Sequence, residues 1–160
     1  MAITDEVRAA NEQYAAGFEK GDLPMPPGRR FAVVTCMDAR LDPARFLGLE
    51  EGDAHVIRNA GGIVTDDALR SLVISHHLLG TQEALVIGHT DCGMLTFTDG
   101  ELRERLGPEA ADVEFHSFPD LEQRVQQSVH AIRESPLLPD SFGAAGYVYD
   151  VRSGRLQEVT

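Results

Sequence analysis

Two short apolar runs restrict the fold of this chain more than any other feature of its sequence. They are FAVV at residues 31–34 and ALVI at residues 84–87. Both runs are apolar at every position instead of at alternate positions, which is typical of a strand buried on both faces. Such strands occur in parallel sheets that helices cover on both sides, so the two runs predict an α/β protein.

The segments between and after these runs predict the remaining elements. Residues 66–79 carry apolar side chains at spacings of three and four and are followed by Gly80, which predicts a helix and its end. Because strands that alternate with helices pair in parallel, we expect a central, mainly parallel β-sheet of strand order 2-1-3-4, with an added C-terminal strand and flanking helices. The other expected elements are strands over residues 31–35, 54–58, 84–88, 145–151 and 156–160 and helices over residues 4–20, 42–47, 101–106 and 120–134.

The chain is expected to form a single domain, residues 1–160. A length of 160 residues suits one hydrophobic core, and no linker divides the chain. Residues 23–28 (LPMPPG) hold three prolines, which exclude a regular helix or strand there. We therefore expect residues 1–28 to form an N-terminal helical arm and connector, ahead of the α/β core.

The composition argues against several classes of function. The net charge of −12 disfavours binding to nucleic acids or anionic membranes, because their phosphates repel an acidic surface. No run of 18 apolar residues would span a bilayer, and residues 1–20 lack the apolar core of a secretory signal. Two cysteines are too few for a disulfide framework. We therefore expect a cytoplasmic protein whose two thiols are reduced or bound to metal.

Reactive residues that follow the two apolar runs define a candidate site. Cys36 follows the first run, and His89 and Cys92 follow the second. Parallel strands bring their carboxyl ends to one edge, and the order 2-1-3-4 reverses between these two strands. Two thiolates and an imidazole are good ligands for Zn²⁺, and three protein ligands leave a position for water. A redox-active or nucleophilic cysteine, and simple packing of both thiols, remain alternatives.

Asp38 and Arg40 add charged groups to the same stretch. In an extended segment a spacing of two places Cys36, Asp38 and Arg40 on one side. Arg40 could hold the Asp38 carboxylate by a two-pronged hydrogen bond. Asp38 could then orient a zinc-bound hydroxide, or it could bind the metal itself and close the site. A local ion pair with no further role is the alternative.

At these residues the sequence resembles the β-class carbonic anhydrases, in their short archaeal and bacterial branch. The resemblance rests on C-x-D-x-R at residues 36–40, VIRNAGG at residues 56–62 and H-x-x-C at residues 89–92. It implies an enzyme that reversibly hydrates carbon dioxide to bicarbonate by a zinc-bound hydroxide. It also implies a homodimer or dimer-based oligomer in which the N-terminal helix packs on the partner subunit. The implied site has one Zn²⁺ per chain on Cys36, His89 and Cys92, with Asp38 and Arg40 as the catalytic pair.

Further expectations concern the pocket and the substrate. The backbone of Asn59, Ala60, Gly61 and Gly62 is expected to approach the site, because glycine permits close contact; a plain turn is the alternative. Some relatives bind bicarbonate at a regulatory site that uses a tryptophan, and this chain has none. Hydrolysis of carbonyl sulfide or carbon disulfide on the same scaffold, a non-catalytic zinc-binding module and a redox protein remain alternative functions. The candidate proton shuttles, by residue type alone, are His55, His76, His77, His116 and His130.

Overall fold

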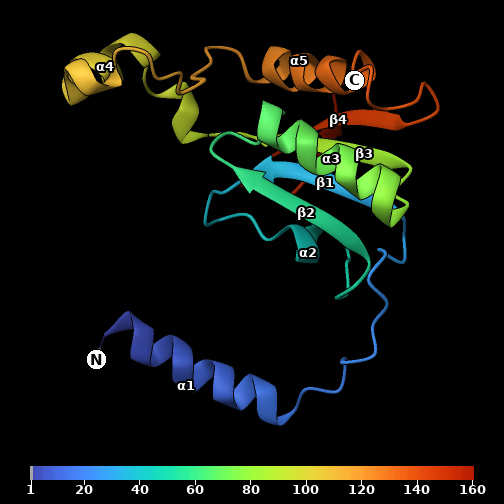
Figure 1. Ribbon diagram of the computed structural model, residues 1–160. Helices are drawn as coiled ribbons and strands as arrows, with labels where there is room; N and C mark the ends of the chain where they lie inside the picture. Colours follow the sequence, from blue (N-terminus) through green and yellow to red (C-terminus); the bar gives the residue numbers. More distant parts are fainter. Residues whose placement is uncertain (1) are drawn as a thin grey trace.

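A five-stranded sheet forms the centre of the molecule (Figure 1). The computed structural model describes residues 2–160. The strand order is β2-β1-β3-β4-β5, in which the first four strands run parallel and β5 is antiparallel to β4. This arrangement confirms the predicted order and the added C-terminal strand. The strands are β1 (Phe31–Cys36), β2 (Ala54–Asn59), β3 (Glu83–His89), β4 (Gly143–Tyr149) and β5 (Leu156–Glu158).

The register of β1 places the two reactive stretches at the same edge of the sheet. Thr35 lies opposite Ile87 of β3, and Cys36 lies opposite Asn59 of β2. Neighbouring strands lie about 4.8 Å apart, so the residues that follow β1 and β3 meet directly. The reversal of strand order between β1 and β3 therefore brings Cys36 beside His89, as the sequence predicts.

Helices lie on both faces of this sheet. The interval 66–79 predicted for α3 agrees with the structure, where the Thr65 side chain caps the first turn and Gly80 takes a left-handed φ of 77° at the end. The helices are α1 (Ile3–Ala16), α2 (Pro43–Phe46), α3 (Asp66–Leu79), α4 (Asp99–Leu106) and α5 (Leu121–Arg133), with short 3₁₀ turns η1 (Gly93–Leu95) and η2 (Pro108–Ala110).

Most other predicted boundaries differ from the structure by one or two residues, including the ends of β4 and β5, and the first helix differs by more. The first helix ends at Ala16 and not at residue 20, since the backbone leaves the helix at Gly17. α4 begins two residues earlier than predicted, because Thr98 and Glu101 form a reciprocal capping box. β4 also begins two residues early, at Gly143, where its pairing with β3 starts. None of these shifts moves a site residue.

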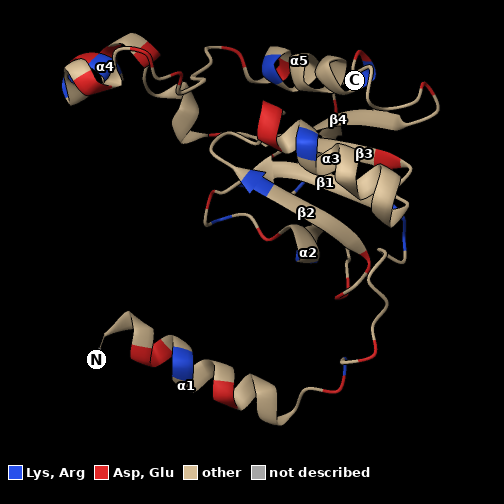
Figure 2. Cartoon of the chain, viewed as in Figure 1, with Lys and Arg blue, Asp and Glu red and all other residues tan. Residues whose placement is uncertain are grey.

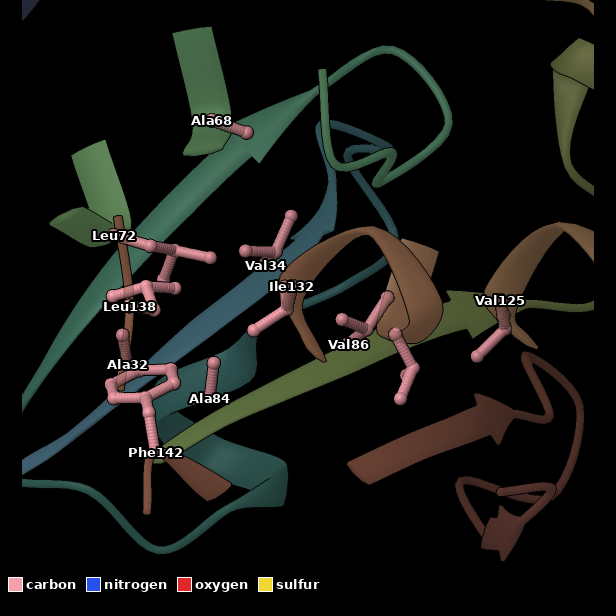
Figure 3. Packing of buried hydrophobic residues seen from close by; sticks show 11 residues of the cluster. Ala32, Val34, Ala68, Leu72, Ala84, Val86, Val125, Ile132, Leu138 and Phe142 are labelled. Carbon is pink, nitrogen blue, oxygen red and sulfur yellow. The ribbon is translucent and has the colours of Figure 1, made fainter. Parts of the chain in front are cut away.

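The largest core cluster fills the space between the sheet and two helices, α3 and α5 (Figure 3). Ala32 and Val34 of β1 point toward these helices, whereas Phe31 and Val33 point to the opposite face, where Phe46 of α2 packs. Both sets are buried, which explains why the run is apolar at every position. A third cluster lies at the carboxyl ends of the strands and includes both cysteines.

Helix α1 lies apart from the rest of the molecule (Figure 1), whereas Lys20, which follows it, forms an ion pair with Glu51. Every residue from 2 to 26 is exposed, and charged residues are distributed along α1 (Figure 2). The connector joins the body at residues 28 and 29, whose backbone N–H groups donate to the carbonyls of Gly52 and Asp53. Among the helices of residues 2–160, none combines the length and apolarity needed to cross a bilayer.

Candidate metal centre

Cys36, His89 and Cys92 converge at the carboxyl ends of β1 and β3. Their ligand atoms all lie within 4.8 Å of one another, although Cys36 and His89 are far apart in sequence. The three residues are 4%, 0% and 2% exposed, so bulk water hardly reaches their polar atoms. A buried set of two sulfurs and one imidazole nitrogen at this spacing can hold a divalent metal ion.

The hydrogen bond of the His89 ring favours the tautomer that can bind a metal ion. Its Nδ1 lies 2.8 Å from the carbonyl oxygen of Thr90, to which it can donate. Nε2 is buried and has no hydrogen-bond partner among residues 2–160. A donating Nδ1–H leaves the lone pair on Nε2, which is the tautomer that binds metal ions. The unpartnered Nε2 therefore fits a zinc ligand.

The two thiols are electrostatically unequal. The Cys92 thiol beside Cys36, together with the His89 ring, lowers the pKa of Cys36. The Gly61 backbone N–H, 3.3 Å from the Cys36 sulfur, acts in the same direction. The pKa of Cys92 is instead raised by its contact with Cys36 and by burial. The site thus accepts one thiolate readily, and a divalent cation would supply the charge needed to hold two.

Asp38 and Arg40 form the two-pronged pair that the sequence predicts. Arg40 Nε donates to Asp38 Oδ1 at 3.0 Å and Nη2 donates to Oδ2 at 2.8 Å. The Arg40 backbone N–H also donates to Oδ1 at 2.8 Å. These bonds hold the pKa of Asp38 well below its usual range. Asp38 Oδ2 lies 3.7 Å from His89 Nε2, so the carboxylate stands directly beside the metal-ligating atoms.

The turn after β2 contributes backbone to the site. The Asn59 side chain closes this turn by accepting from the Ile63 N–H at 2.9 Å and donating to the Ile63 carbonyl at 2.8 Å. Gly61 then points its N–H at the Cys36 sulfur, and Gly62 packs against the backbone of β1. Of residues 59–62, Gly61 thus contacts Cys36 and, with Ala60, lines the cavity beside the site, whereas Asn59 and Gly62 hold the turn in place.

A cavity of about 280 Å³ opens beside the sulfurs. Its wall combines the loop after β1, the turn after β2 and the loop after β3. Two methionine side chains and small residues make most of this wall apolar, and Asp38 contributes its charged group. The lining residues are Cys36, Met37, Asp38, Ala60, Gly61, Cys92, Gly93 and Met94.

The five remaining histidines lie outside this cavity lining. His55 Nδ1 lies 2.7 Å from Ser75 Oγ, and His76 Nδ1 lies 2.6 Å from the Thr81 carbonyl. His77 Nε2 is 2.7 Å from the Leu137 carbonyl. These three side chains join α3 to its surroundings, so the structure brings none of them to the metal ligands.

Two further residues contact the site and were missed by the sequence analysis. Arg58 donates to the carbonyls of Cys36, Asp38 and Leu41 at 2.9, 2.8 and 3.2 Å, which ties down the loop after β1. Asp91 contacts Arg40 from the loop after β3. The parallel pairing of β1 with β2 could have located Arg58, which lies opposite Thr35. No local pattern indicates the contact of Asp91.

Comparisons with known proteins identify relatives over the whole length of the chain. The carbonic anhydrase family model matches residues 31–112. Beta-carbonic anhydrase 1 of Mycobacterium tuberculosis is 50% identical, covering 100% of this chain and 99% of that protein. A carbonic anhydrase structure from Streptococcus mutans is 46% identical, covers 100% and 99% of the two chains and superimposes with a TM-score of 0.95. A carbon disulfide hydrolase from an Acidianus species is 36% identical, over 92% of this chain and 84% of that protein.

Proposed function

The chain belongs to the β-class carbonic anhydrase family, and from this membership we propose that it catalyses the reversible hydration of carbon dioxide to bicarbonate. The observation that carries the proposal is the buried Cys36–His89–Cys92 donor set next to a carboxylate, Asp38, which Arg40 holds in place. A purely structural metal site has no need of a positioned carboxylate or of an open cavity beside it.

The proposed cofactor is one Zn²⁺ per chain, held by the two sulfurs and by His89 Nε2. When bound, zinc lowers the pKa of a water molecule and so supplies hydroxide near neutral pH. The protein's own contribution is a dry, preformed donor set: its ligands are buried, and His89 is oriented by its hydrogen bond to Thr90. Two thiolates and a neutral imidazole match the double charge of the ion.

Asp38 would accept a hydrogen bond from the attacking hydroxide and so aim an oxygen lone pair at the carbon of the substrate. Asp38 is a carboxylate at neutral pH, as is usual for Asp, and Arg40 stabilises this form further, so Asp38 can only accept hydrogen bonds. A hydroxide that donates to Asp38 is therefore held in a single orientation. This positioning is the role that we assign to the Asp38–Arg40 pair.

The mainly apolar cavity suits a small, uncharged substrate. Met37, Met94 and Gly61 offer apolar surface, which suits carbon dioxide better than it suits bicarbonate. The cavity thus suits the uncharged substrate of the hydration direction.

Hydrolysis of carbon disulfide or carbonyl sulfide is the second candidate function. It is favoured by the similarity to the Acidianus protein, which is named a carbon disulfide hydrolase. The attack on a linear molecule by hydroxide is chemically the same. Relative turnover of the three substrates by one preparation separates the two candidates.

We also infer that the chain forms a homodimer through α1. Ile3, Val7 and Tyr14 lie on one face of this helix and are 70%, 59% and 56% exposed. None of the residues of this helix is buried by any other part of residues 2–160. An apolar stripe in this setting favours packing on a partner surface, and a second copy of this chain would supply one. Phe18 continues the stripe just beyond the helix.

The proposed function is tested by stopped-flow measurement of carbon dioxide hydration, with the zinc content determined on the same samples. We expect one zinc per chain, and Asp38→Asn should retain zinc but lose activity on the order of 10²-fold or more. Asp67→Asn is the matched control, since Asp67 pairs with Arg70 on the surface of α3, away from the site. Full activity of Asp38→Asn would contradict the assigned role, and zinc-loaded protein that turns over only carbon disulfide or carbonyl sulfide would establish the second candidate.

A further inference from the structure

Asp91 lies between His89 and Cys92 in the loop after β3, and its side chain contacts Arg40. Arg40 Nη1 donates to Asp91 Oδ2 at 2.8 Å, and Nη2 donates to the Asp91 carbonyl oxygen at 2.8 Å. The side chain and the backbone of one residue thus hold two nitrogens of the same guanidinium. This contact joins the loop after β3 to the loop after β1.

The backbone of Asp91 is arranged for this contact. Its φ of 55° lies in the left-handed region, which non-glycine residues rarely adopt. Asp tolerates this region better than most residues, but the conformation still has a cost. Residues in such conformations persist where the surrounding structure requires them, and they concentrate at functional sites. Here the conformation directs both the carbonyl and the carboxylate of Asp91 toward Arg40.

The Arg40 guanidinium donates hydrogen bonds to two aspartates. Nε and Nη2 donate to Asp38, and Nη1 and Nη2 donate to Asp91. The Arg40 side chain is 47% exposed, so burial alone does not fix its long side chain. The contacts with Asp91 therefore restrict the guanidinium to the orientation in which it forms both hydrogen bonds to the Asp38 carboxylate.

We infer that Asp91 is a positioning residue, which acts through Arg40 to keep the Asp38 carboxylate aimed at the reacting oxygen. The inference rests on the proposed function for its effect on turnover, but the contact that it describes is independent of turnover. Asp91 is 71% exposed, and exposed ion pairs add little to folding stability. Its removal should therefore affect the geometry of Arg40 much more than it affects the stability of the fold.

The first test measures Arg40 directly by NMR. The exchange of the Arg40 Nε–H proton with water is followed in the wild type, in Asp91→Asn and in Asp67→Asn, with the signal assigned by its loss in Arg40→Lys. We expect exchange to become about tenfold faster in Asp91→Asn, because a loosened guanidinium releases its donors to water, and to be unchanged in Asp67→Asn. Unchanged exchange in Asp91→Asn would overturn the inference, whatever the enzyme does.

The second test is a double-mutant cycle on turnover. Asp91→Asn should lower kcat about tenfold at unchanged zinc content and melting temperature, whereas in an Asp38→Asn background it should cause no further loss. Equal losses in both backgrounds would show that Asp91 acts by another route and would overturn the inference. If the wild type itself fails to hydrate carbon dioxide, the proposed function fails, and the exchange measurement alone decides the role of Asp91.

Discussion

Gly62 lies against the backbone of β1 in the turn after β2. Its φ is 63°, and a Cβ atom built on it would lie 2.8 Å from the Cys36 nitrogen and 2.8 Å from the Thr35 carbonyl carbon. These are backbone atoms of β1 and cannot rotate away. Glycine is therefore needed at residue 62 for two reasons, its left-handed backbone and the absence of a side chain.

A comparison of Gly62→Ala with Gly48→Ala separates the effect of the left-handed backbone from the effect of the close contact. Gly48 has the same φ of 63°, but no atom of residues 2–160 beyond its chain neighbours lies within 4 Å of its Cβ position. Gly48→Ala should lower the free energy of unfolding by about 1–2 kcal/mol, the cost of the left-handed conformation. Gly62→Ala adds the clash and should lower it by about 2–5 kcal/mol in all. Urea unfolding of both variants checks this, and equal losses would disprove a specific contact at Gly62.

At the scale of elements, two glycines determine how closely α5 packs on the sheet. A Cβ atom at Gly146 of β4 would lie 2.7 Å from Val125 Cγ1, and one at Gly88 of β3 would lie 2.8 Å from Val125 Cγ2. Val125 is 3% exposed and belongs to the main core cluster. The position of α5, which packs over the strand that ends in His89, therefore depends on the absence of side chains at these two positions.

A double-mutant cycle tests this packing. Gly146→Ala should destabilise the protein by about 1–3 kcal/mol through overpacking. Combined with Val125→Ala, which makes room for the added methyl group, the loss should be smaller than the sum of the single losses by about 1 kcal/mol. The same cycle with Leu72→Ala on α3 should be additive within about 0.5 kcal/mol. Additivity in both cycles would contradict the close approach of α5.

The Asp99 carboxylate links α4 to the loop that follows it. Asp99 accepts hydrogen bonds from the backbone N–H groups of Phe115, His116 and Ser117 at 2.8, 3.1 and 2.8 Å. The hydrogen bonding of Ser117, and then of Phe115 and His116, holds the pKa of Asp99 well below its usual range. The ionised carboxylate thus orders residues 115–117, which form no regular secondary structure.

The stabilisation by Asp99 should depend on pH. Because the pKa of Asp99 is lower in the folded state than in the unfolded chain, its contribution is complete above about pH 5 and is lost as the pH falls below about 3.9. Urea unfolding should show the wild type to be more stable than Asp99→Asn by about 1–2 kcal/mol at pH 7, and this difference should shrink toward pH 2. Asp112→Asn, in the same exposed region, should show no such change. A pH-independent difference for Asp99→Asn would refute the assignment.

For the whole molecule, the proposed dimer assigns a role to the N-terminal arm. α1 carries its apolar residues on one face and its acidic residues Asp5 and Glu12 on another, and it is exposed on all sides in a single chain. Burial of the apolar face would stabilise the helix, which at 14 residues is marginal on its own in water. In the proposed dimer, burial of this apolar face would stabilise the helical conformation of α1.

Light scattering tests this assembly. The wild type should have twice the 17.5 kDa mass of one chain, whereas Val7→Asp combined with Tyr14→Asp should shift the mass toward that of a monomer. Asp5→Ser combined with Glu12→Ser alters the opposite face and should leave the dimer intact. A monomeric wild type at micromolar concentration would disprove the proposed role of α1.

Local patterns were sufficient for much of the fold. Uniformly apolar runs predicted the buried strands, the spacing of apolar residues predicted α3, and alternation of strands and helices predicted the sheet order. The grouping of Cys36, His89 and Cys92 followed from that order, since parallel strands present their carboxyl ends at one edge. These features depend on the spacing of apolar residues and on the order of strands and helices along the chain, and both can be read from the sequence.

Other features of the site were decided only by the tertiary structure. The contact of Asp91 with Arg40 needs a left-handed backbone and a partner 51 residues away, and the three bonds of Arg58 need the exact course of the loop after β1. The unpartnered Nε2 of His89 and the exposure of α1 likewise depend on what does and does not pack nearby. Hydrogen bonds between distant loops are set by distance and direction in space, and no local pattern of residues records them.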